Sequence, residues 1–225
     1  MCRLAVVSFA LIALLALPAV SAERGTRLFT EQASDGSLLG WKSFSEGTAK
    51  SGDVWRLANG VLHCKGKPNG YIYTEKAYSD FTLRLEWRTP PGEKPGRGGV
   101  LVRTTGPHKI WPKSLEAQLN SPDEGDFWGL DGFRLAGPAE RMKTIETSPF
   151  GKLINVKKAQ TALRPVGQWN QYEIVANGPT VILRINGKEV NRATDCDAVA
   201  GPICLTSEGD PIEFRAIEIV EGNGR

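Results

Sequence analysis

Histidine is scarce in this chain, since only His63 and His108 carry an imidazole among 225 residues. The sequence also has no Ser-His-Asp signature, no glycine-rich phosphate loop and no His-Glu-x-x-His motif, so it gives no sign of a serine hydrolase, a nucleotide-binding enzyme or a zincin. No Cys and His spacing matches a zinc site. The 28 Lys and Arg residues nearly balance 25 Asp and Glu and form no basic tract, so we expect no nucleic-acid partner.

Long apolar runs are also missing, except for one at the N-terminus. Arg3 precedes an apolar stretch at residues 4–17, and small residues at 20–22 end it before Glu23. This layout predicts a signal peptide over residues 1–22, because the stretch is short for a membrane span. An uncleaved anchor is the alternative. With no second such stretch, we expect export to the periplasm or the extracellular space and no membrane attachment after cleavage.

Cleavage would leave an odd number of cysteines, Cys64, Cys196 and Cys204. In an oxidising compartment at least one thiol then stays unpaired. The turn-like segment between Cys196 and Cys204 favours a disulfide between these two, with Cys64 buried and free. The alternative is that all three are small buried hydrophobic residues.

Turn signals, in contrast, are frequent. Asn-Gly pairs at 59–60, 69–70, 177–178 and 186–187 separate short runs of β-branched and aromatic residues, as in antiparallel hairpins. Strands are expected at residues 81–88, 114–119, 169–176, 180–185, 188–192 and 212–220. The sequence therefore predicts one all-β domain over residues 23–225, a sandwich of two antiparallel sheets with about a dozen strands.

Three segments carry more specific expectations. The alternation in residues 212–220 slips by one position near Ala216, which predicts a β-bulge. The Gly- and Pro-rich residues 89–99 join two strong strands and are interpreted as a hairpin loop. Residues 138–146 alone have appreciable helix propensity, and an ordered loop is the alternative.

Polar residues recur at every second position of several expected strands, on the face that points away from the expected core. Glu86 lies in the strand at 81–88, Arg103 follows an apolar run, and Glu116 and Gln118 alternate with apolar neighbours. If these strands are adjacent, one sheet face carries carboxylates, an amide and a guanidinium that could grip hydroxyl-rich ligands. The alternative is an ordinary solvated face with cross-strand ion pairs.

Two loops add aromatic and charged groups. Residues 106–113 contain His108, Trp111 and Lys113. Residues 121–128 contain three acidic residues, one of them Asp126, and two aromatic residues, one of them Trp128. Aromatic faces stack on sugar rings and carboxylates accept hydroxyl hydrogens, so the loops favour a carbohydrate ligand. The acidic loop could also hold a divalent cation such as calcium, although it matches no EF-hand.

Several motifs in order resemble one family. They are NGVLHCKGKPNGY (59–71), DFTLRLEWR (80–88), IWPKSLEAQL (110–119), GDFW (125–128), WN (169–170), CLTSEG (204–209) and EFR (213–215). The chain resembles the 3-keto-disaccharide hydrolase domain family over about residues 29–220. The resemblance implies a concanavalin A-like jelly roll, export from a bacterial cell and hydrolysis of oxidised disaccharides. Thr206 and Ala216 depart from the family's usual Gln and Asn.

The implied substrate class suggests a mechanism. A ketone at C3 acidifies the C2 hydrogen, so a base can remove it and the C1 substituent can leave. The resulting hypothesis has Glu116 as base, Glu86 or His108 as acid, Arg103 or Lys113 as enolate stabiliser, and Gln118, Trp111, Asp126 and Trp128 as further substrate contacts. A two-carboxylate glycosidase, a non-catalytic lectin-like module and a structural surface protein are the alternatives.

Overall fold

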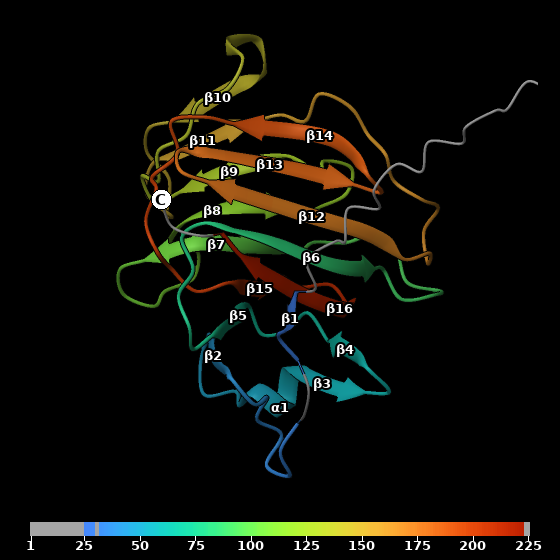
Figure 1. Cartoon of the computed structure of the whole chain (residues 1–225). Coiled ribbons are helices and arrows are strands. Elements are labelled where there is room, and N and C mark those ends of the chain that lie inside the picture. The colour runs from blue at the N-terminus through green and yellow to red at the C-terminus, as the bar shows by residue number, and fades with distance from the viewer. Residues whose placement is uncertain (1–24, 30–31, 223–225) are drawn as a thin grey trace, which may run out of the picture.

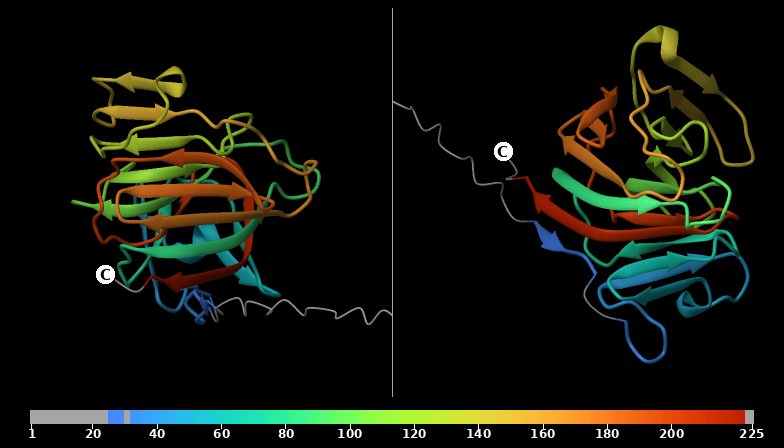
Figure 2. Two further views of the ribbon diagram at one scale, coloured as in Figure 1. Left: turned by 45° about the horizontal axis from the view of Figure 1, so that its top comes forward. Right: turned by 90° about the vertical axis from the view of Figure 1, so that its right-hand side faces the viewer.

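A computed structural model describes residues 25–29 and 32–222, so the predicted signal peptide lies outside the described residues. The chain forms a jelly-roll sandwich of two antiparallel sheets, which confirms the predicted fold (Figure 1 and Figure 2). The described residues contain sixteen strands rather than about a dozen, because several two- to five-residue strands extend the sheets. Neither helix in this part of the chain has the length and apolar character needed to cross a bilayer.

The first sheet has the order β14-β13-β12-β6-β16-β4-β3, with β1 beside β16. Its strands are β14 (Lys188–Ala193), β13 (Thr180–Ile185), β12 (Asn170–Asn177), β6 (Phe81–Arg88), β16 (Ile212–Glu221), β4 (Val61–Cys64), β3 (Trp55–Ala58) and β1 (Thr26–Arg27). The predicted strands at 81–88 and 180–185 are therefore correct to the residue.

The second sheet has the order β10-β11-β9-β8-β7-β15-β5-β2. Its strands are β10 (Met142–Ile145), β11 (Leu153–Val156), β9 (Phe127–Leu130), β8 (Lys113–Gln118), β7 (Gly99–Thr105), β15 (Cys204–Ser207), β5 (Gly70–Thr74) and β2 (Trp41–Ser45). The helical elements are α1 (Ser51–Val54) and a 3₁₀ turn, η1 (Ala139–Arg141).

Strict alternation builds the core between the sheets. Leu83 and Leu85 of β6 and Val100 and Leu115 of the second sheet are almost fully buried in one cluster. Their sequence neighbours therefore point away from the core, because side chains alternate across a strand. This places Glu86 on the outer face of the first sheet and Glu116 on the outer face of the second.

The predicted bulge in β16 is confirmed. Its register with β6 shifts between Arg215 and Glu218, and Ala216 within this interval has φ of +49°. A side chain with a Cβ is strained in this left-handed region, whereas Asn is tolerated there better than most residues. The Asn usual in the family thus fits the backbone at this position better than Ala216 does.

We predict that Ala216→Asn stabilises the protein by about 0.5–1 kcal/mol, because Asn adopts positive φ more readily and Ala216 is exposed. Urea unfolding would measure the change, with Ala139→Asn at an exposed position outside the left-handed region as the matched control. An unchanged or lowered free energy of unfolding for Ala216→Asn would contradict the prediction.

Two segment interpretations are wrong. Residues 89–99 form no hairpin loop, because β6 and β7 belong to different sheets and this segment crosses between them. Residues 138–146 form η1 and β10 rather than a longer helix, since β10 pairs with β11 along its whole length. Figure 1 shows this β10–β11 hairpin projecting beyond the neighbouring strands.

The predicted Cys196–Cys204 disulfide is also wrong. Cys64, Cys196 and Cys204 are buried free thiols. Cys196 belongs to the core between the sheets, whereas Cys204 belongs to a smaller cluster with Tyr71 and Leu101 on the outer face of the second sheet. Burial raises the pKa of Cys64 to about 11 and those of Cys196 and Cys204 to about 12, so these thiols stay protonated.

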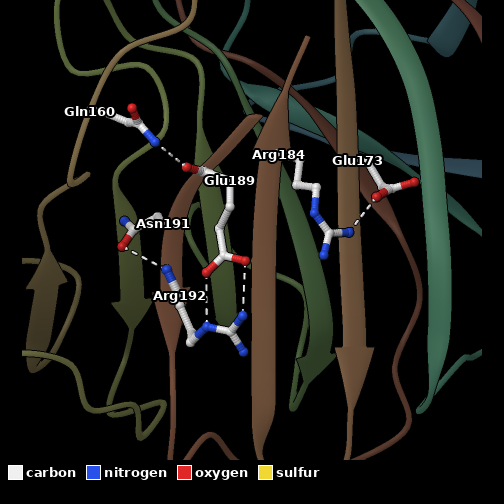
Figure 3. A network of polar contacts seen from close by, with 6 residues as sticks. All are labelled: Gln160, Glu173, Arg184, Glu189, Asn191 and Arg192. Carbon is white, nitrogen blue, oxygen red and sulfur yellow. Dashed lines mark hydrogen bonds and ion pairs between the residues drawn. The ribbon is translucent and has the colours of Figure 1, made fainter. Parts of the chain in front are cut away.

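Charged ladders cover the outer face and edge of the first sheet. Figure 3 shows Arg192 donating to Glu189 at 2.9 Å within β14, and Arg184 of β13 donating to Glu173 of β12 at 2.6 Å. All four side chains are at least a quarter exposed. This face matches the alternative of a solvated surface with cross-strand ion pairs, and charges along the edge strand also discourage edge-to-edge association.

Candidate functional site

A cleft of about 560 Å³ opens on the outer face of the second sheet. Its lining includes polar side chains from several loops and strands together with a group of aromatic and aliphatic ones. The polar members are Lys67, Asn69, Arg97, Glu116, Gln118, Asn120 and Glu208, and the apolar members are Trp111, Trp128, Leu130, Phe150 and Leu153. The volume lies in the range of small-ligand pockets.

The register of three adjacent strands sets the floor of the cleft. Glu116 of β8 lies opposite Leu101 of β7 and opposite Trp128 of β9. Gln118 lies opposite Gly99. A Cβ at Gly99 would stand 2.5 Å from Glu116 Oε1, so any other residue there would displace this carboxyl group from its position. The sequence thus reserves space for Glu116 on the sheet face.

Glu116 and Glu208 form a coupled pair of buried carboxyl groups, 7% and 8% exposed. Burial raises the pKa of Glu116 well above its usual range, and the charge of Glu208 raises it further. Burial also raises the pKa of Glu208, against the opposing effects of the Thr206 and Asn120 side chains and of Arg97. The pair therefore retains a proton at a pH where ordinary carboxyl groups are ionised.

The proton belongs mainly to Glu116. Arg97 and the Thr206 and Asn120 side chains favour the ionised form of Glu208, whereas the Asp210 carboxylate, which pairs with Arg97 at 3.7 Å, disfavours it. Glu116 is buried and lies near the Glu208 carboxyl group, and both of these effects disfavour ionisation of Glu116. Glu208 Oε1 is buried without a hydrogen-bond partner among the described residues, so this oxygen is free to accept a hydrogen bond from a bound ligand. Burial raises the pKa of both carboxyl groups, and that of Glu116 is raised further, so Glu116 holds its proton to a higher pH than Glu208, a difference that suits acid–base chemistry on a bound ligand.

Aromatic side chains complete the cleft. The Trp128 indole N–H donates to Gln118 Oε1 at 2.6 Å, which fixes both groups on the sheet. Trp111 packs edge-on against Phe150 with ring centroids 6.4 Å apart. Trp111 has φ of +59°, a strained conformation for a bulky residue that is often found at binding sites.

The cleft brings together four of the predicted site residues, Glu116, Gln118, Trp111 and Trp128. Arg103 is elsewhere, because a bulge between Val102 and Thr105 reverses the alternation of β7. Arg103 has φ of +55° and is fully buried, and its guanidinium donates to the carbonyls of Ser79 and Asp197. It therefore ties loops together outside the cleft.

Lys113 and Asp126 also lie outside the cleft. Lys113 is three positions from Glu116 on β8, so it alternates to the other side of the strand, and its Nζ lies 3.2 Å from Asp197 Oδ2. Asp126 is 3% exposed and accepts hydrogen bonds from the backbone N–H of Lys158 at 2.9 Å and the Asn155 amide at 3.3 Å. Both residues hold loops in place.

His108 and Glu86 do not meet Glu116 either. His108 lies over β2 and β5, where its Nδ1 is 2.9 Å from the Tyr71 hydroxyl and its ring is 4.4 Å from that of Tyr73. Glu86 belongs to the first sheet and accepts a hydrogen bond from Arg215 at 2.5 Å. Neither group lines the cleft, so the hypothesis that one of them is the acid loses its geometric basis.

Sequence reasoning missed several cleft residues, above all Glu208. Leu205 points into the core, so the alternation of side chains along the strand could have placed Thr206 and Glu208 on the outer face. Asn120 and Arg97 follow and precede strands, where parity gives no guidance. Phe150 comes from the turn of the β10–β11 hairpin, which is far from the other cleft residues in sequence.

Among residues 25–29 and 32–222, no group of three or more His, Cys, Asp and Glu side chains gathers as metal ligands would. In the acidic loop at 121–128, Asp126 is committed to the hydrogen bonds described above. The possible divalent cation in this loop therefore gains no support from the geometry.

The buried pair has a consequence for stability. The pKa of Glu116 is higher in the folded protein than in the unfolded chain. Between these two pKa values folding takes up a proton, so the free energy of unfolding falls as pH rises through this interval. We predict that Glu116→Gln raises the free energy of unfolding at pH 8 by about 1–3 kcal/mol, with little difference at pH 4. Urea unfolding at both pH values measures this, and exposed Glu140→Gln is the control. A Glu116→Gln protein less stable than wild type at pH 8 would contradict it.

Solved structures share this fold. A candidate glycosyl hydrolase from Parabacteroides distasonis is 18% identical, with a TM-score of 0.57 over 82% of this chain and 89% of that one. The carbohydrate-binding module CBM66 from Bacillus subtilis is 13% identical, with a TM-score of 0.56 over 80% and 94%. The kappa-carrageenase from Pseudoalteromonas carrageenovora is 9% identical, with a TM-score of 0.54 over 91% and 99%. At these identities the likeness establishes the shared fold.

A search of curated proteins found no match to this sequence. The family model described as the 3-keto-alpha-glucoside-1,2-lyase-like domain matches residues 26–220, nearly all of the described chain. This match confirms the resemblance noted from the sequence motifs. The chain belongs to the 3-keto-alpha-glucoside-1,2-lyase-like family.

Proposed function

We propose that this protein is an enzyme that cleaves the glycosidic bond of 3-keto-glycosides, and that Glu116 and Glu208 carry the reaction. The observation that supports it most is this pair of buried, coupled carboxyl groups in one cleft. Perturbed carboxyl groups that meet in a cleft are typical of catalytic sites. Membership of a family named for a lyase acting on 3-keto-alpha-glucosides supports the substrate class.

The reaction is a β-elimination. A base removes the hydrogen at C2, which the neighbouring C3 ketone acidifies, and the electron pair forms an enolate across C2 and C3. Collapse of the enolate forms the C1–C2 double bond and breaks the C1–O bond. The departing oxygen takes a proton from an acid and leaves as an alcohol. Addition of water across the new double bond would complete a net hydrolysis.

The electrostatics of the cleft assign the two carboxyl groups. Glu208 loses its proton more readily than Glu116 and would act as base at C2, whereas Glu116 would act as acid toward the glycosidic oxygen. This assignment reverses the role that the sequence-based hypothesis gave to Glu116. The reason is Arg97, which pairs with Asp210 at 3.7 Å and also lowers the pKa of Glu208, whereas no cation lowers the pKa of Glu116.

The enolate also needs a positive charge, because negative charge develops on the C3 oxygen. Arg103 and Lys113 lie outside the cleft, but Arg97 and Lys67 line it. We assign enolate stabilisation to these two cations. The amides of Gln118 and Asn120 would orient the sugar hydroxyls.

The experiment is incubation of the protein with 3-keto-glucosides and with their unoxidised parents, while release of the aglycone is followed. Release from the 3-keto-glucosides alone supports the proposal. A two-carboxylate glycosidase would also release the aglycone from the parents. Tight binding of the sugars without any release would favour a non-catalytic carbohydrate-binding module. We propose export as well, because residues 1–22 have the layout of a signal peptide.

A further inference from the structure

The cleft has two chemically different ends along the strand direction. Glu116 and Trp128 face each other in the middle of β8 and β9. Toward the end of β8 come Gln118 and then Asn120, with Arg97 and Glu208 on the adjacent segments. This end is polar and charged.

The opposite end is apolar. Ser114, two residues before Glu116, pairs with Leu130, and Leu153 of β11 packs against the hydrophobic cluster that contains Leu130. Trp111 packs against the same cluster, and Phe150, which also lines the cleft, packs edge-on against Trp111. From Ser114 to Gln118 the strand spans roughly 14 Å, at about 3.4 Å per residue. The two ends are therefore far enough apart to contact different parts of one ligand.

The apolar end offers a ligand almost no hydrogen bonds from side chains. Leucine and phenylalanine have no donor or acceptor, so among Trp111, Leu130, Phe150 and Leu153 only the Trp111 indole N–H can donate. The Trp128 indole N–H is already bound to Gln118 at 2.6 Å. Hydroxyl groups buried here would lose their water without gaining partners, which is unfavourable.

We propose that the substrate's leaving group, its aglycone, occupies this apolar end and is aromatic or aliphatic rather than a second sugar. The inference rests on the proposed function, because it places the oxidised sugar at the polar end. The acid Glu116 would then lie at the boundary, where the glycosidic oxygen must be. The base Glu208 and the cation Arg97 would lie beside C2 and C3 of the sugar ring.

Phe150 is the best residue on which to test this specificity. It is 38% exposed at the turn of the β10–β11 hairpin, so its truncation removes an apolar contact from the cleft without opening the core. Leu39, which is 64% exposed and does not line the cleft, provides the matched control.

The experiment compares benzyl 3-keto-α-glucoside with a 3-keto-disaccharide. Both release an alcohol, and the sugar hydroxyl is the more acidic of the two, so leaving-group acidity favours the disaccharide and cannot by itself produce a preference for the benzyl compound. We expect kcat/KM to be at least about 10-fold higher for the benzyl compound. Phe150→Ala should lower that value by about 10-fold and change the disaccharide value by less than about 2-fold, and Leu39→Ala should change neither.

Binding to the Glu116→Gln protein separates this inference from the proposed function. Tighter binding of the benzyl compound by about 10-fold supports the apolar subsite even if the wild-type protein cleaves neither substrate, in which case the proposed function alone fails. Equal or better binding and turnover of the disaccharide would overturn the inference and leave the proposed function standing. Failure to bind either compound would overturn both.

Discussion

The Glu116→Gln protein should lose about 1,000-fold in kcat on benzyl 3-keto-α-glucoside, while still folding and binding this substrate. The amide has the size of the carboxyl group but cannot protonate the departing oxygen, and a general acid contributes about 10²- to 10⁴-fold. The loss should be much smaller, about 10-fold, on the p-nitrophenyl analogue, because p-nitrophenolate leaves without protonation. Steady-state kinetics on the two substrates measure this contrast.

Two further variants make the result interpretable. Glu208→Gln removes the proposed base and should lower kcat by a similarly large factor on both substrates. Glu124→Gln is the matched control, because burial also raises the pKa of Glu124 but this residue does not line the cleft. Equal losses for Glu116→Gln on both substrates would show that Glu116 is not the acid. Unchanged turnover would remove it from the mechanism.

Replacement of Arg103 by methionine should destabilise the fold by about 3–5 kcal/mol, lowering Tm by about 10 °C, without affecting turnover by the folded protein. The guanidinium is fully buried, donates to the Ser79 and Asp197 carbonyls and pairs with Asp80 at 3.4 Å. Methionine leaves these acceptors without partners inside the protein, which is costly. Thermal unfolding and kcat per folded molecule measure the two effects.

Arg84→Met is the control for this prediction. Arg84 pairs with Glu173 at 2.7 Å, but its side chain is 48% exposed, so its loss should cost less than about 1 kcal/mol. If the Arg103→Met protein were as stable as wild type but inactive, Arg103 would have a catalytic role and the assignment of the cleft would be wrong.

The fold was largely predictable because alternation and turn chemistry are local signals. Strand β6 follows from the strict alternation of residues 81–88, and the bulge in β16 follows from a phase slip at Ala216. The same signals do not say which strands share a sheet. The segment at 89–99 joins β6 to a strand of the other sheet, so Glu86 and Glu116 lie on opposite outer faces despite their matching parity.

The candidate site was predictable only where a regular strand carries it. Glu116 and Gln118 project from β8 as parity requires, and Trp128 follows on β9. Arg103 defeats the same reasoning because a residue with positive φ reverses the alternation of β7. Glu208 lies just past the end of β15, and its importance depends on its nearness to Glu116, which no local pattern shows.

Elimination at C2 is the central claim, and isotope incorporation tests it most directly. The wild-type protein is incubated with benzyl 3-keto-α-glucoside in D₂O, and the released sugar is followed by NMR at early times, with an enzyme-free sample as the control for spontaneous exchange. Elimination followed by addition of water places deuterium at C2, or leaves an unsaturated 3-keto sugar. Release of a sugar that retains hydrogen at C2, or equally fast release from the unoxidised glucoside, would contradict the account.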